Sequence, residues 1–91
     1  MIPVIVIAEL VYILRRLPGK MPVEKILNTL ETEDRFEIYP LTLPVIRKSA
    51  SLPSLDMHDA LIAATALELH LPLMTCDQKI IRSKTVQTLV P

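Results

Sequence analysis

The sequence contains a single glycine, Gly19, so it has no glycine-rich loop of the kind that binds nucleotide phosphates. Its single cysteine, Cys76, excludes an internal disulfide bond and lacks the spacing of a zinc site. Ten basic and ten acidic residues cancel, so composition predicts no strongly electropositive surface. Nucleic-acid binding would therefore depend on local basic clusters, unless these are only the solvated ends of helices and turns. The two candidate clusters are Arg15, Arg16 and Lys20, and Lys79, Arg82 and Lys84.

The sequence also lacks a hydrophobic run long enough to cross a membrane. The apolar N-terminal run, residues 2–14, is interrupted by Glu9 and is shorter than the roughly 20 residues that a membrane span needs. No basic segment precedes this run and no small-residue cleavage site follows it, so the features of a signal peptide are missing. Together with the lone cysteine, this pattern predicts a cytoplasmic protein in a reducing compartment, with no membrane partner.

What the sequence does contain is a high apolar content in a short chain. With 91 residues, of which 51% are hydrophobic, we expect a single domain over residues 1–91, near the lower size limit for one hydrophobic core. The sequence shows no internal repeat and no low-complexity segment.

Strand-like and helix-like segments alternate along the chain. The unbroken, mostly β-branched run at residues 4–8 predicts a strand covered on both faces, and the leucine spacing at residues 9–16 predicts a helix that ends at Leu17-Pro18-Gly19. The later predicted elements are a helix at 23–30, a strand at 36–41, a helix at 42–50 capped by Thr42, a helix at 57–70, a strand at 73–75, a helical turn at 78–82 and a strand at 86–90.

This alternation predicts an α/β fold. We expect a mostly parallel sheet of about four short strands, with right-handed crossovers and helices on both faces. The helix at 57–70 should be sandwiched, because little of it beyond Thr65, Glu68 and His70 is polar enough to face solvent. In such sheets, functional residues gather outside the carboxyl ends of the strands.

Three acidic residues are predicted at that edge. Glu9 directly follows the first predicted strand, Asp77 follows the third, and Asp59 lies in the first turn of the helix that leads into the third. Two carboxylates about 5 Å apart repel by roughly 3 kcal/mol at an effective dielectric near 20, so three together need a proton or a cation. Mg²⁺ or Mn²⁺ prefers such oxygen ligands, activates water and binds phosphate oxygens. The pattern therefore favours phosphodiester hydrolysis.

Each polar residue of this group also has a structural explanation. Asp56 is a natural N-cap, and Asp59 three residues later can complete a capping box. Glu9 could favour a helix N-terminus through the helix dipole, and Asp77 could cap the helical turn that follows it. Thr75 could orient a metal-bound water or a phosphate, or it could cap its own turn.

These motifs together resemble a PIN domain of the VapC-like toxin type. The matching segments follow the family's order across nearly the entire chain: Ile7-Ala8-Glu9-Leu10-Val11-Tyr12, Phe36-Glu37-Ile38-Tyr39-Pro40-Leu41-Thr42, Asp56 to Leu67, and Pro72-Leu73-Met74-Thr75-Cys76-Asp77. The resemblance implies a Rossmann-like fold and a metal-dependent endoribonuclease that uses Mg²⁺ or Mn²⁺ to cleave single-stranded RNA, and it implies an antitoxin-like partner.

The same resemblance implies roles for individual residues. Glu9, Asp59 and Asp77 match the family's metal-binding and catalytic acids, with Thr75 as a further catalytic group and Asp56 as a possible auxiliary. The chain departs from the pattern because the family's first strand, which carries a fourth acid in mid-sheet, is not recognisable. We therefore expect a partial PIN domain with an incomplete site and weak or no activity. Unpaired strand edges would then favour a homodimer or other self-association.

Two further interpretations remain open. A non-catalytic, PIN-derived interaction module could bind an antitoxin-like partner through Leu10, Ile13, Leu14 and the helix at 23–30. A receiver-like α/β module would also bind Mg²⁺ at strand-end acids. That module would need an acidic pair after its first strand and a lysine at a strand end, and the sequence shows neither.

Overall fold

The structure is a computed structural model that describes residues 1–17, 19 and 22–91. Lys20 of the first basic cluster and Pro18 of the predicted helix end lie outside the described residues. Gly19 has φ +91°, a left-handed conformation that favours glycine. The chain divides into two units, Met1–Pro40 and Leu41–Pro91, and each is described by itself.

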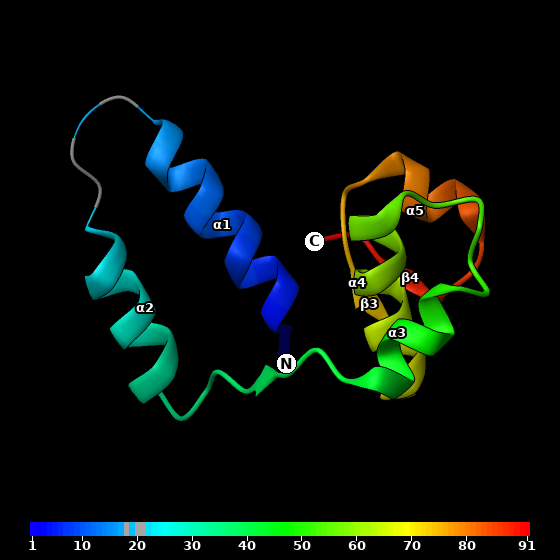
Figure 1. Cartoon of the computed structure of the whole chain (residues 1–91), viewed down its shortest axis with the longest axis horizontal. Coiled ribbons are helices and arrows are strands. Elements are labelled where there is room, and N and C mark those ends of the chain that lie inside the picture. Colours follow the sequence, from blue (N-terminus) through cyan, green and yellow to red (C-terminus); the bar gives the residue numbers. More distant parts are fainter. Residues whose placement is uncertain (18, 20–21) are drawn as a thin grey trace. The chain divides into compact units, whose positions relative to one another are not determined.

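The described residues of the first unit form two strands and two helices (Figure 1). They are β1 (Ile2–Pro3), α1 (Val4–Arg16), α2 (Val23–Thr32) and β2 (Ile38–Tyr39). β1 and β2 pair in parallel, with Ile2 opposite Ile38 and Pro3 opposite Tyr39. The amide of Ile2 donates to the carbonyl of Glu37 at 2.6 Å, which extends this pairing by one hydrogen bond. The helix predicted at 23–30 is confirmed as α2, and the strand predicted at 36–41 is confirmed only over Ile38–Tyr39.

The strand predicted at residues 4–8 is wrong, because these residues form the first turns of α1. Pro3 is both the last residue of β1 and the N-cap of α1, with φ −61° and ψ 137°. An apolar run without a polar position fits the period of a strand and of a helix equally well, so β-branching alone misassigned it. Glu9 therefore lies in the second turn of α1 and does not follow a strand end.

The second unit contains three helices and a second pair of strands. They are α3 (Leu43–Ser49), α4 (Met57–Glu68), β3 (Leu73–Met74), α5 (Gln78–Ser83) and β4 (Thr88–Leu89). Thr42 caps α3 as predicted, since its hydroxyl accepts a hydrogen bond from the amide of Val45 at 3.3 Å. β3 and β4 pair in parallel, with Leu73 opposite Thr88. Each unit thus holds one parallel pair of strands, consistent with an α/β fold, and the single four-stranded sheet stays a prediction.

Helix α4 is the centre of the second unit's core. Ala63, Ala64 and Val45 of the neighbouring helix α3 have no exposed surface at all. The other buried residues of this unit are Leu52, Ala60, Leu61, Thr65, Ala66, Ile80 and Val86. The sandwiched position predicted for α4 agrees with this burial, and the small alanine side chains leave room for close helix packing.

Two details of the predicted helix at 57–70 are wrong. Thr65 was expected to face solvent but is 3% exposed, because its hydroxyl donates to the carbonyl of Leu61 at 2.8 Å and needs no water. The helix also ends at Glu68, two residues early. His70 then adopts φ +54°, which turns the chain before β3.

Among the helices in the described ranges, none combines the length and apolar character that a membrane crossing requires.

We predict that Ala64→Leu lowers the free energy of unfolding by about 1–3 kcal/mol, because the added carbons have no space around α4. The control is Ala50→Leu at the exposed end of α3, which should change stability by less than about 0.5 kcal/mol. Urea denaturation monitored by circular dichroism measures both variants. Equal stability of the two variants would contradict the tight packing of α4.

Candidate functional site

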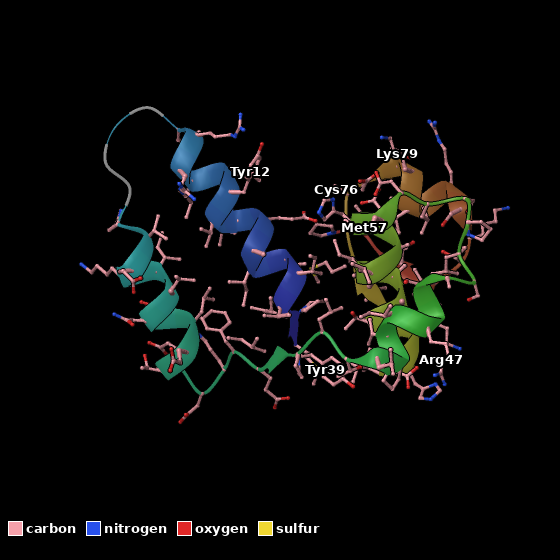
Figure 2. All side chains as sticks on the ribbon, viewed as in Figure 1. Tyr12, Tyr39, Arg47, Met57, Cys76 and Lys79 are labelled. Atoms are coloured by element: carbon pink, nitrogen blue, oxygen red, sulfur yellow. The ribbon has the colours of Figure 1, made fainter. Side chains whose placement is uncertain are left out.

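One end of the second unit brings together the start of α4, the end of β3 and the start of α5 (Figure 1). β3 comprises only Leu73–Met74, and the chain continues through Thr75 and Cys76 to the start of α5. Figure 1 shows α4 and α5 beginning at the same end of this unit. Figure 2 shows Met57, Cys76 and Lys79 at this same end. The predicted site residues Asp59 and Asp77 are neighbours in sequence of these labelled residues.

Asp56 is the N-cap of α4, as its structural explanation predicted. Its Oδ1 accepts a hydrogen bond from the backbone amide of Asp59 at 3.0 Å. Asp59 itself is half-buried in the first turn, where the helix dipole favours a carboxylate. The cap therefore fixes the backbone that carries Asp59.

Asp77 and Thr75 form a second capping arrangement, at the start of α5. The amide of Lys79 donates to Oδ1 of Asp77 at 2.9 Å, and the amide of Asp77 donates to Oγ1 of Thr75 at 3.0 Å. Thr75 is anchored in turn, because its amide donates to the carbonyl of Leu89 in β4 at 3.0 Å. A carboxylate offers about four lone-pair sites, so a capping Asp77 can still bind a cation.

Glu9 is in a different environment, in the second turn of α1. The residue is half-buried, and its Oε1 is buried without a hydrogen-bond partner among the described residues. A buried polar atom left unpaired costs about 1–3 kcal/mol, and more when it is charged. A bound cation would relieve this cost, so the carboxylate of Glu9 is suited to be a metal ligand.

The predicted metal site joins residues of both units, with Glu9 in the first and Asp59 and Asp77 in the second. Within each unit, over residues 1–17, 19 and 22–91, no three histidine, cysteine or acidic side chains gather around a possible metal position. The meeting of these acids at one ion therefore stays a prediction, with Asp59 in the first turn of α4 and Asp77 at the N-cap of α5.

Sequence reasoning did not recognise the aromatic partner of the first basic cluster. The guanidinium carbon of Arg16 lies 4.3 Å from the centroid of the Tyr12 ring, and both residues line a surface pocket with Arg15. The i, i+4 spacing of Tyr12 and Arg16 on one helix could have revealed the pair. In the second cluster, Arg82 lies in the last turn of α5 and Lys84 is its C-cap, which agrees with the helix-end explanation.

A family model described as the PIN domain matches residues 1–85, which is nearly the whole chain. This chain belongs to the PIN domain family. Neither the curated proteins nor the solved structures gave a match to it. The short parallel strands with helices between them are consistent with a PIN fold. Membership supports a nuclease-type function in general, in a family whose members generally depend on divalent metal ions.

We predict that alanine substitutions remove the two caps of this PIN domain, whereas asparagine substitutions retain them. Asp56→Ala and Asp77→Ala should each lower the free energy of unfolding by about 1 kcal/mol, because an amide proton at the helix start loses its acceptor. Asp56→Asn and Asp77→Asn keep a side-chain oxygen and should stay close to the parent stability. Thermal and urea denaturation test the prediction, and equal losses for alanine and asparagine would contradict the capping role.

Proposed function

We propose that this PIN domain is a metal-dependent endoribonuclease of the VapC toxin type, acting on single-stranded RNA in the cytoplasm. The observation that carries the proposal is that α4 and α5, which hold Asp59 in the first turn and Asp77 at the N-cap, begin at the same end of the second unit. In α/β folds, this carboxyl end of the strands is where ligands bind. The family match over residues 1–85 supports the nuclease class.

Glu9, Asp59 and Asp77 are the proposed ligands of Mg²⁺ or Mn²⁺. When bound, such an ion supplies an activated water and neutralises charge on a phosphodiester. The buried, unpaired Oε1 of Glu9 supports its place in this set, because a carboxylate oxygen without a donor favours a cation. Asp59 and Asp77 would provide the remaining protein oxygens, and carboxylate oxygen is the ligand type that these hard cations prefer.

Thr75 and Asp56 are proposed as positioning residues of this site. Thr75 accepts a hydrogen bond from the amide of Asp77, and Asp56 accepts one from the amide of Asp59. Each therefore holds the backbone of one proposed ligand. Outer residues that orient metal ligands commonly change metal affinity or activity by about 10–100-fold. Asp56 therefore has an auxiliary function without touching the ion.

The chain offers three matching acids where the family resemblance implies four, so we propose weak metal binding and weak or no turnover. A site with fewer carboxylates has less negative charge to offset the dehydration of the cation. Millimolar Mn²⁺ is therefore the appropriate condition for an assay.

We predict that the purified chain binds Mn²⁺ and cleaves a single-stranded RNA oligonucleotide slowly, and that Asp59→Asn reduces both by at least about 10–100-fold. Asparagine removes the charge and retains a similar shape. Isothermal titration calorimetry measures metal binding independently of cleavage, and gel analysis of a labelled RNA measures turnover. Asp34→Asn, an exposed acid in the turn before β2, is the matched control and should behave like the parent.

Two results would refute the nuclease proposal. A cooperatively folded chain that binds no Mn²⁺ and cleaves no RNA would remove its chemical basis. Metal-dependent cleavage that persists unchanged in Asp59→Asn, Asp77→Asn and Glu9→Gln would place the active site elsewhere.

A second candidate function is a non-catalytic module that binds an antitoxin-like partner. Three apolar or aromatic residues near the end of α1 are largely exposed: Tyr12 at 58%, Ile13 at 54% and Leu17 at 45%. Leu14, which the sequence placed on this surface, is 8% exposed and unavailable to a partner. Folded protein without metal binding would favour this second function. Sedimentation velocity tests the homodimer that we propose for either case.

A further inference from the structure

We propose that Tyr12, Arg15 and Arg16 form a subsite for single-stranded RNA on α1, with a nucleobase stacked on the Tyr12–Arg16 pair and neighbouring phosphates bound by the two arginines. The proposal deepens the proposed function, because it assigns residues that hold the substrate outside the acidic site. It does not require those acids to bind a metal.

The three residues share one face of α1. Positions i, i+3 and i+4 lie side by side on a helix, and Tyr12, Arg15 and Arg16 have this spacing. They line a surface pocket of about 290 Å³, just below the usual range of small-molecule sites. This size suits a planar base or a phosphate group. Figure 2 shows Tyr12 projecting outward from α1.

The Tyr12 ring is unusual because it is both exposed and paired. It is 58% exposed while the Arg16 guanidinium lies 4.3 Å from its centroid. A second arginine–aromatic pair among the described residues, Arg35 and Phe36 at 5.0 Å, involves a half-buried phenylalanine. Tyr12 therefore retains accessible ring surface that Phe36 does not offer. Aromatic rings and guanidinium planes are the surfaces on which unpaired bases stack.

The charges of Arg15 and Arg16 complete the site. Both arginines are exposed in the last turn of α1, where the helix dipole favours positive charge. The dipole explains the charge but not the exposed tyrosine beside it. Both side chains are exposed, so their guanidinium groups can reach phosphates. A purely acidic peptide would use the charges and not the ring, whereas an unpaired base with its phosphates uses both, which is why RNA is favoured.

Binding can be measured without catalysis. Fluorescence anisotropy with a labelled single-stranded RNA dodecamer in EDTA compares the full chain with Tyr12→Ala, Tyr12→Phe, Arg15→Gln and Arg16→Gln. The matched control is Arg47→Gln, at an exposed arginine in the last turn of α3 that has no aromatic ring beneath it among residues 1–17, 19 and 22–91. All changed residues are exposed, and circular dichroism confirms that each variant is folded.

We expect Tyr12→Ala to weaken binding about fivefold or more and Tyr12→Phe to retain it, since stacking needs the ring and not the hydroxyl. Arg15→Gln and Arg16→Gln should weaken binding and each lower the slope of log affinity against log salt by about 0.7. Arg47→Gln should bind like the parent, and a duplex RNA of the same length should bind more weakly, because its bases are already stacked.

Several outcomes would overturn the subsite. They are no RNA binding by the parent, equal binding by Tyr12→Ala, an equal loss in Arg47→Gln, or binding of a poly-glutamate peptide that competes fully with RNA and is insensitive to Tyr12→Ala.

The same data separate this proposal from the nuclease. Tyr12-dependent RNA binding in a chain that binds no Mn²⁺ would support the subsite and refute the nuclease. The opposite result is Mn²⁺-dependent cleavage that Asp59→Asn abolishes, together with RNA binding by Tyr12→Ala that equals that of the parent. This result would support the nuclease and refute the subsite.

Discussion

The complete burial of Ala63 and Ala64 in α4 is the constraint on which the second unit depends. A helix with alanines at its centre can be approached closely by its neighbours, and larger side chains there would force them apart. Because α4 is held in this way, the residues at its start have a defined place relative to β3. The location of Asp59 is therefore a consequence of packing several residues away from it.

The polar residues at this end of the unit combine structural and proposed chemical roles. Asp77 caps α5 through one carboxylate oxygen, and Thr75 fixes the backbone of Asp77 from the adjoining strand. A cap needs only one acceptor, while a carboxylate offers several, so the structural role does not compete with a bound cation. It also restricts the rotamers of the side chain, which reduces the entropy that a ligand would otherwise have to remove.

Features encoded locally could be predicted from the sequence. In the caps formed by Thr42, Asp56 and Asp77, a side-chain oxygen accepts a hydrogen bond from a backbone amide two or three residues later. Residue type and spacing are therefore sufficient to predict these caps. Residues 4–8 could not be assigned correctly, because an all-apolar run carries no periodicity. Thr65 was placed on the wrong side because its hydroxyl bonds a carbonyl of its own helix, an option that makes a polar residue compatible with a core.

Parts of the candidate site that depend on local structure could also be predicted. The sequence predicts Asp59 in the first turn of a helix and Asp77 directly after a strand, and the structure has Asp59 in the first turn of α4 and Asp77 at the N-cap of α5, three residues after β3. Their meeting at one edge rests on the rule for parallel sheets and stays a prediction. Glu9 was placed by the position of a strand that is a helix in the structure. The sequence does not identify Tyr12 as a candidate binding residue, because that role depends on the exposure of its side chain, which a sequence pattern does not report.

The helical position of Glu9 changes the physical argument for its role. One turn before and one turn after it, α1 carries Ile5 and Ile13, so no basic side chain at i±4 can pair with the carboxylate. A leucine at this position would extend the apolar character of the helix and avoid the cost of a buried, unpaired oxygen. A buried polar group that has no nearby hydrogen-bonding or charged partner is typical of functional positions. The buried, unpaired oxygen of Glu9 is therefore consistent with the cation-binding role that we propose for it.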